Sequence, residues 1–344
     1  MPQRAIDCSV SATDQPQSGL MHAAEIAVTP RRLRQLGALL TLAYIAAIAA
    51  LAGVTDVSTI LFPELGALAH DVFTRPRGAW ARSPLWLATT PVVAAVVGIL
   101  IARHMSFGLA SVFLSVGSTV GLIQILQSPI APAVSAGLLP LVLGITSWWY
   151  PPSILLGTAA LALLAVIRTT MFPQAPESGF TGTDNADDTV ETAASGLVWM
   201  PYFFGFLLAV AALALLTGWH LLLFPPLVVM GYEMFAHPTI CPWAGRPWAL
   251  FLACTLSATF GIVFVSLLGI GPLAAIGSLG AGIMILDVLD LHVPPALAVG
   301  LLPFIIGHPN WELPLAVAGG VLVLTGAFAL WRRLNVRKER TPRA

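Results

Sequence analysis

The chain is poor in charge for its length. Asp, Glu, Lys and Arg make up 9% of its 344 residues, whereas 57% are apolar and the mean hydropathy is +0.87. A soluble globule needs far more charge to cover its surface, so that class is excluded. The composition predicts an all-α, polytopic integral membrane protein whose main partner is the lipid bilayer.

Signals for several other functions are also missing. The net charge is zero and no basic face could neutralise phosphates, which excludes nucleic-acid binding. Cys8, Cys241 and Cys254 form no CxxC pair, so neither a disulfide framework nor a thiolate metal site is expected. The sequence has no nucleotide-binding motif, so neither ATP coupling nor a cofactor is predicted.

Long uncharged runs predict the membrane segments. Residues 106–167 contain no Asp, Glu, Lys, Arg or His. One crossing takes about 20 residues, so this stretch predicts three segments, joined near 129–132 and 147–152. The segment at 57–72 is short and contains Glu64, which predicts a broken or re-entrant element. The remaining predicted segments are 36–54, 85–102, 197–217, 219–235, 247–268, 272–289, 293–307 and 313–331.

The chain also repeats itself. One set of residues recurs 163 positions later without a gap: Pro132, Ala133, Gly137, Leu138, Leu139, Pro140, Gly144, Trp148, Pro151 and Gly157. Upstream, Phe62-Pro63 and Asp71 match Phe224-Pro225 and Glu233 at a spacing of 162. Self-similarity at a fixed period indicates duplication. We expect two repeats of about five or six membrane segments each, at 35–168 and 197–332.

Charged residues gather outside the repeats. Residues 1–34 are predicted to be a disordered cytoplasmic tail, and residues 333–344 a basic one. Arginines flank the first and last spans, which predicts that both termini lie on the cytoplasmic side of the inner (plasma) membrane of a cell. Residues 169–196 are acidic and lack Lys and Arg, which predicts a solvated linker that is disordered and dispensable for insertion.

The number of crossings per repeat stays open at this stage. Two termini on one side allow six plus six crossings in parallel or five plus five inverted. Because the linker has no Lys or Arg, its composition slightly favours the outside, and with it inverted repeats.

Three ionisable residues stand near the second copy of the repeated segment. Asp287 and Asp290 are three residues apart, so they share a helix face, and His292 follows. Their counterparts are Gln124 and Gln127. One interpretation is a carboxylate pair that handles a proton or cation; the alternative is two acids solvated at the membrane interface. An Asp-x-x-Asp-x-His metal site lacks a fourth ligand, so no metal is predicted.

A second set of charges occupies matching positions in the two repeats. Asp71 is followed four residues later by Arg75, and Glu233 by His237, so each acid can pair with its base on one helical face. These pairs are candidates for a gate or for a structural ion pair that caps a segment end. Arg246, like His237, is a candidate partner for the Asp287 and Asp290 carboxylates.

Prolines interrupt the same apolar segments in both repeats. Pro295 and Pro303, like Pro132 and Pro140, lack a backbone N–H donor. Pro294 directly precedes Pro295. The N-terminus of a helix that begins inside the membrane can bind an anion. The alternative is a kink that neighbouring helices tolerate.

Three stretches of the second half resemble the HPP family of integral membrane proteins, which is named for a His-Pro-Pro motif. They are residues 236–238, 241–247 and 291–296, although Val293 separates His292 from the two prolines. The resemblance covers about residues 219–331 and, more faintly, 57–168. It implies a transporter whose relatives are associated with nitrite movement.

Taken together, the patterns predict a secondary transporter or channel for a small inorganic ion, an anion such as nitrite by resemblance. Duplication, broken spans and sparse buried polar groups all fit a site near the midplane. An integral-membrane enzyme acting on a lipid-linked substrate is the main alternative, although no loop carries a dense catalytic cluster. A non-transporting scaffold is a third interpretation.

Overall fold

The computed structural model describes residues 30–171, 188–194, 196–306 and 310–340, and every regular element in those ranges is a helix. Eight of these helices are long and apolar enough to cross a bilayer, so the prediction of an all-α, multi-pass membrane protein is confirmed. The elements of the first half are α1 (Pro30–Thr55), η1 (Ser58–Ile60), α2 (Glu64–Thr74), α3 (Pro84–His104), α4 (Leu109–Leu126), α5 (Ala133–Leu143) and α6 (Tyr150–Met171). Those of the second half are α8 (Met200–Thr217), η2 (His220–Leu223), α9 (Pro225–Ala236), α10 (Pro247–Leu268), α11 (Pro272–Leu289), α12 (Pro294–Leu301), η3 (Leu302–Phe304) and α13 (Glu312–Arg340).

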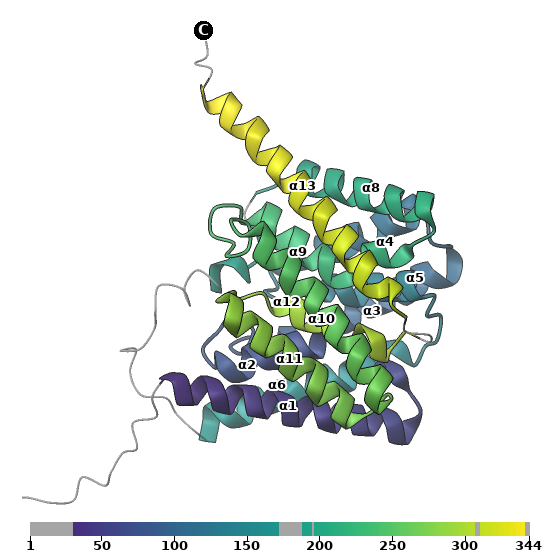
Figure 1. Cartoon of the computed structure of the whole chain (residues 1–344), viewed down its shortest axis with the longest axis vertical. Coiled ribbons are helices and arrows are strands. Elements are labelled where there is room, and N and C mark those ends of the chain that lie inside the picture. The colour runs from purple at the N-terminus through teal and green to yellow at the C-terminus, as the bar shows by residue number, and fades with distance from the viewer. Residues whose placement is uncertain (1–29, 172–187, 195, 307–309, 341–344) are drawn as a thin grey trace, which may run out of the picture.

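Four short helices form the inside of the bundle. In Figure 1, α12 packs against α2 and α9, and α9 packs against α5. Each begins at or directly after a proline, namely Pro63, Pro132, Pro225 or Pro294. Proline is tolerated there because the first turn of a helix leaves its N–H groups unbonded. The predicted proline-broken segments are therefore present, and Pro140 and Pro303 are buried with them.

The contacts of one half recur in the other. α1 packs against α2 and α11, as α8 packs against α9 and α4. α3 packs against α4, α5 and α6, as α10 packs against α11, α12 and α13. Each half thus makes the same internal contacts. Its first long helix, α1 or α8, also packs against a helix of the other half.

Details of packing follow the 163-residue spacing. Ser115 Oγ donates to the Gly137 carbonyl oxygen at 2.8 Å, and Ser278 Oγ donates to the Gly300 carbonyl oxygen at 2.7 Å. Small residues let the long helices approach the short ones this closely. Gln127 and Asp290 end α4 and α11 in the same left-handed conformation, with φ of 48° and 46°.

Two matched glycines are expected to be intolerant of a side chain. A Cβ atom on Gly98 would lie 2.2 Å from the Gly137 carbonyl oxygen, and one on Gly261 would lie 2.3 Å from that of Gly300. Gly98→Ala and Gly261→Ala should each cost about 2 kcal/mol or more through overpacking, seen as a lower thermal midpoint in detergent. Gly121→Ala is the control, because nothing lies within 4 Å of its Cβ position. Equal midpoints in all three variants would contradict the packing.

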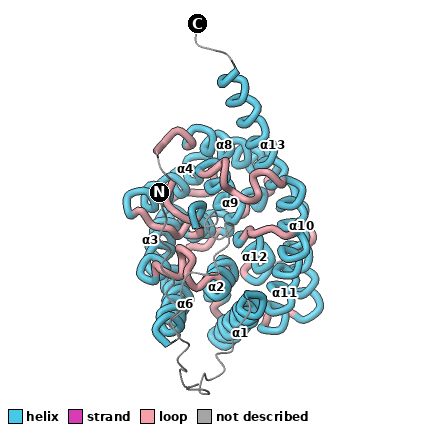
Figure 2. The backbone as a smooth tube through the Cα atoms, turned by 90° about the vertical axis from the view of Figure 1, so that its left-hand side faces the viewer, coloured by secondary structure: helices cyan, strands magenta, loops and turns pink. Residues whose placement is uncertain are grey.

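One end of the bundle holds the start of α1, the end of α6, the start of α8 and the end of α13, and we call it the linker end because it also holds residues 188–194. Gly37 of α1 lies against the carbonyl of Phe73, and Arg168 of α6 donates to the same oxygen. Trp331 of α13 packs edge to face against Phe235 of α9. Figure 2 looks onto this end, with loops crossing the middle of the bundle.

This arrangement corrects the slight preference for inverted repeats that was based on the composition of the linker. With α1 and α8 both starting at the linker end, the two halves run in the same direction. The lack of Lys and Arg in the linker misled the expectation because acidic residues carry little weight in orientation.

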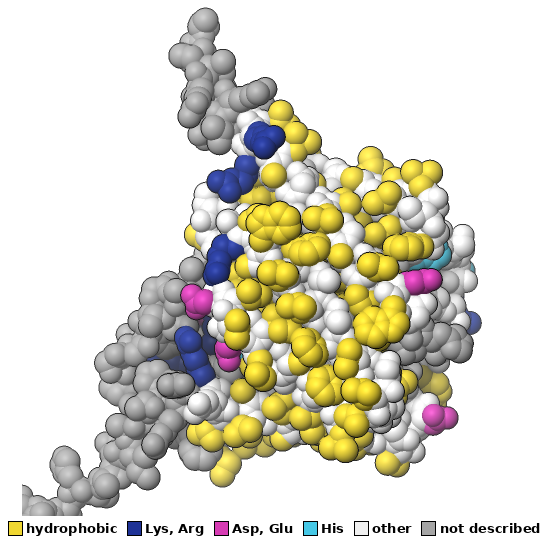
Figure 3. All heavy atoms as spheres, viewed as in Figure 1, with side chains coloured by type: hydrophobic (Ala, Val, Ile, Leu, Met, Phe, Trp, Pro, Cys, Tyr) yellow, Lys and Arg dark blue, Asp and Glu magenta, His cyan; other side chains and the backbone are white. Residues whose placement is uncertain are grey.

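The outer face matches a lipid environment. Figure 3 shows apolar side chains spread over α8, α10, α11 and α13, with Lys and Arg near one edge. Exposed large side chains there include Leu208, Leu252, Leu256, Met284, Leu315 and Leu322. An apolar surface this extensive is stable only against lipid or another apolar partner.

Candidate functional site

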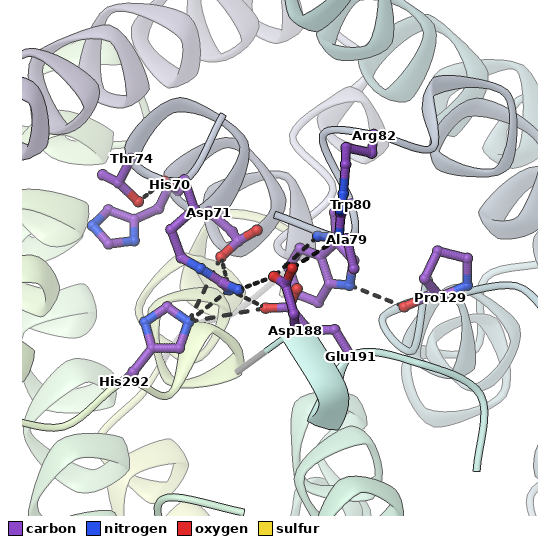
Figure 4. Close-up of polar contacts among 11 residues, drawn as sticks. His70, Asp71, Thr74, Ala79, Trp80, Arg82, Pro129, Asp188, Glu191 and His292 are labelled. Carbon is purple, nitrogen blue, oxygen red and sulfur yellow. Dashed lines mark hydrogen bonds and ion pairs between the residues drawn. The ribbon is translucent and has the colours of Figure 1, made fainter. Parts of the chain in front are cut away.

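The Arg75 guanidinium lies at the centre of a buried charge cluster at the linker end. Figure 4 labels the other members of the cluster, which are Asp71, Asp188, Glu191 and His292. Its Nη1 atom donates to Asp71 Oδ1 at 2.7 Å and to Glu191 Oε1 at 2.5 Å, while Nη2 donates to Asp188. The Nε2 atom of His292 lies 3.4 Å from Nη1. The Asp71 side chain is fully buried, and that of Arg75 is 10% exposed.

Three separate parts of the chain supply this cluster. Asp71 lies in the last turn of α2 and Arg75 directly follows that helix, and the i, i+4 spacing brings the two side chains together. Asp188 and Glu191 come from the end of the linker, and His292 comes from the loop between α11 and α12. Both halves and the linker therefore meet on one guanidinium.

Asp188 also connects the linker to the loop after α2. Its Oδ2 accepts from Arg82 at 2.8 Å, and its Oδ1 accepts from the Ala79 backbone N–H at 3.2 Å. The Arg82 side chain is 63% exposed, so this second ion pair lies in solvent and contributes little. Arg75 is the better anchor because its partners are shielded from water.

Burial sets the protonation of Glu191. Desolvation first, and the neighbouring Asp71 carboxylate second, raise the pKa of Glu191 to about 7. Contacts with His292 and Arg75 act in the opposite direction. Glu191 therefore titrates near neutral pH, and its protonation removes one negative charge from the surroundings of Arg75.

This shift predicts a pH dependence of stability. Glu191 titrates at about 7 in the fold and near 4.5 in an unfolded chain, so the folded state binds the proton more tightly. The thermal midpoint in detergent should therefore fall as pH rises from about 4.5 to about 7. Glu191→Gln cannot titrate and should flatten that part of the profile. An equally steep fall in the variant would show that another group is responsible.

Beneath the cluster lies a small cavity lined by side chains from both halves. Its lining is Trp80, Val190, Glu191, Glu233, Trp243, His292 and Pro294, and its volume of about 10 Å³ holds roughly one water molecule. Trp80 Nε1 donates to the Pro129 carbonyl oxygen at 2.9 Å. Trp243 follows Trp80 by 163 residues, so the two indoles occupy matching places.

The linker fills the space above that cavity, which corrects the expectation of a solvated and disordered segment. Val190, Glu191 and Ala194 are 2%, 4% and 3% exposed. On the side of the second half, His237 Nε2 lies 3.2 Å from the Thr192 carbonyl oxygen. The expectation is wrong for residues 188–194, whereas 172–187 and 195 lie outside the described residues. The basic tail expected at 333–344 continues α13 up to Arg340, and residues 1–29 and 341–344 also lie outside.

The expected pairing of Asp287 and Asp290 with cations is not what the structure shows. Both acids are exposed at the end of α11, which is the interfacial alternative. Arg246 instead donates to the backbone carbonyls of Asp290 and Leu289, so it caps the helix end. Of the three residues in that motif, His292 alone reaches the charge cluster.

Of the matching glutamines, Gln124 and Gln127, only the first contacts a residue of the other half. Gln124 Nε2 donates to the Tyr232 hydroxyl at 3.3 Å, and the Ala194 N–H is 3.5 Å from that oxygen. Gln127 is exposed and donates to the Gln124 carbonyl oxygen. Gln124 thus supports the linker from the first half, whereas Gln127 ends α4.

Asp71, Glu191 and His292 could offer a metal three ligands, since their ligand atoms lie within 4.8 Å of one another. Two carboxylates and an imidazole suit a divalent transition metal. The guanidinium of Arg75 already lies between the two carboxylates and supplies the positive charge. The cluster is therefore organised around an arginine.

Sequence reasoning missed Asp188, Glu191 and the depth of Glu64. An available signal was charge complementarity: the linker is acidic, and the loop after α2 carries Arg75, Arg77 and Arg82.

Comparisons of the chain with protein-family models, curated proteins and solved structures found no match.

Proposed function

We propose that this protein is a secondary transporter or channel for a small inorganic anion, and that the Arg75 cluster is its entrance at the linker end. The observation that carries the proposal is that two carboxylates of the linker, those of Asp188 and Glu191, bind Arg75, a largely buried cation. A pathway for anions needs such a charge at its mouth, shielded from water.

The chemistry of the carboxylates indicates the kind of anion. A carboxylate presents two oxygens that share one negative charge, and a guanidinium binds this group through a planar fork of donors. Nitrite is also bent, with two oxygens and one negative charge. It can therefore take the place of the Glu191 carboxylate on Arg75 without any change in the donors.

The arrangement of the two halves supports a transporter over a scaffold. Matching contacts at a spacing of 163 residues are what two copies of one unit would make, and we infer an internal duplication with parallel halves. In transporters of that kind the halves rock against each other around a site at their interface. The Arg75 cluster lies at such an interface, because α2, the linker and the loop before α12 all contribute to it.

The family and the orientation belong to the same proposal. The motifs at residues 236–247 and 291–296 support membership of the HPP family. Arginines in the first turns of α1 and at the end of α13 support a cytoplasmic linker end in a plasma membrane. Both termini would then be cytoplasmic.

Transport in proteoliposomes tests the proposal against its rivals. Purified protein should give saturable uptake of nitrite, measured with nitrate, chloride and sulfate as competitors and with protein-free liposomes as the control. A bilayer enzyme or a scaffold predicts no uptake above that control. Absence of saturable uptake for all four anions would defeat the proposal.

A further inference from the structure

Glu64 is a buried carboxyl group deep in the interior of the bundle. It is 1% exposed and is the first residue of α2, which follows the break at Pro63. The hydroxyl of Ser135, in the first turn of α5, lies beside it and is fully buried. Among the described residues, neither carboxylate oxygen of Glu64 nor the Ser135 hydroxyl has a well-formed hydrogen bond.

The fold itself does not require polar groups at this place. The positions that match Glu64 and Ser135 in the second half are Pro226 and Ala298, both apolar and buried. The second half packs the same elements without an acid, so the carboxyl group is an addition to one half. A buried ionisable group that packing does not need indicates a function.

The surroundings of Glu64 can stabilise one negative charge. α2 and α5 both begin beside this carboxyl group, so the positive ends of two helix dipoles lie next to it. The first N–H groups of both helices already donate to preceding carbonyls, as Leu65 does to Phe62 and Ser135 does to Pro132, so the dipoles act on Glu64 through their field. When Glu64 takes up a proton, its negative charge is lost, and the same field then favours a small anion in the interior.

Glu64 is also aligned with the entrance. It lies seven residues before Asp71 on α2, which is two helical turns, or about 10 Å, along one face. Asp71 is in the Arg75 cluster. The helix therefore runs from the proposed entrance to Glu64, and the two acids lie on the same face of it.

Resting on the proposed anion transport, we propose that Glu64 is a proton-binding site that couples transport to H⁺. One proton joins the carboxylate as one monovalent anion enters the interior, so the charge of the loaded interior equals that of the empty one. Release on the other side reverses both events. The cycle moves one proton with each anion and no net charge.

Nitrate is the probe for this coupling, because its conjugate acid is too strong to cross a membrane as the neutral molecule. Proteoliposomes that enclose a pH-sensitive dye should acidify inside when nitrate is added outside, with about one proton entering per nitrate. An inward proton gradient should concentrate nitrate inside. Nitrate uptake without proton movement would overturn the coupling alone, whereas no uptake of any anion would overturn the proposed function.

Two variants locate the coupling. Glu64→Gln cannot bind a proton and should lose acidification and gradient-driven accumulation, while its nitrate exchange should no longer depend on pH. Glu312→Gln is the matched control, because Glu312 also begins a helix but is exposed. It should keep one proton per nitrate.

Proton coupling that survives in Glu64→Gln would overturn the assignment. If this variant does not fold, Glu64→Asp decides instead. Its shorter side chain draws the carboxyl group away from Ser135, which should shift the pH of half-maximal uptake. An unchanged pH profile in that variant would also overturn the assignment.

Discussion

Removing the Arg75 guanidinium is expected to lower nitrite uptake at least tenfold. The variant combines Arg75→Gln with Asp71→Asn, because Arg75 alone cannot be removed without leaving the buried Asp71 carboxylate unpaired. A charged hydrogen bond contributes about 1.5 to 3 kcal/mol, and 1.4 kcal/mol corresponds to a factor of ten. The initial rate of uptake by proteoliposomes measures the effect.

The control for this variant removes an arginine from the same loop. Arg82→Ala deletes a guanidinium that also binds Asp188 but is 63% exposed, so its loss should change uptake by less than about twofold. Arg75→Lys keeps the charge but not the planar fork, and should fall between the two. Wild-type uptake in the double variant, with normal folding, would place the anion path elsewhere.

The second large effect is expected when the linker loses its carboxylates. Asp188→Asn combined with Glu191→Gln replaces both ion pairs of the linker to Arg75 with weaker, neutral hydrogen bonds. Residues 188–194 should then leave the space between the halves more often. Anions would compete more easily for Arg75, and we expect uptake to rise about tenfold at low nitrite concentration.

Two other acids at the same end provide the control. Asp287→Asn with Asp290→Asn removes the same charge from the linker end, but both side chains are exposed at the end of α11. Uptake in this variant should match the wild type. Equal increases in both double variants would mean that net charge, and not the ion pairs between the linker and Arg75, controls the entry of anions. Slower uptake in the linker variant would show that its carboxylates are needed for transport.

The bundle could be predicted from the sequence because each of its features has a local cause. Apolar length predicts a crossing, and prolines at matching positions, such as Pro132 and Pro295, predict where helices begin inside it. The pair of Asp71 and Arg75 follows from spacing on one helical face. These are properties of short stretches of chain.

The assembled site could not be predicted in the same way. Glu191 lies 116 residues from Arg75 along the chain, and His292 lies 217 residues away, so only the packing of the two halves brings them together. The linker looked solvated because its average composition is polar, yet Val190, Glu191 and Ala194 are buried. Ion pairs join Asp188 and Glu191 to Arg75. Asp287 and Asp290 drew attention as intramembrane acids, although Asp287 lies in the last turn of α11, Asp290 caps that helix, and both side chains are exposed.

Protection of a single cysteine at the entrance tests the central claim most directly. In a background without the native cysteines, Asp188→Cys places a thiol beside Arg75, where the wild-type residue is 19% exposed. A membrane-impermeant, sulfonate-bearing thiol reagent applied at the linker end should attach an anion there and block nitrite uptake. Excess nitrite should slow the modification, because it binds the same guanidinium. Complete modification that leaves uptake unchanged, or a modification rate that nitrite does not alter, would contradict an anion entrance at Arg75.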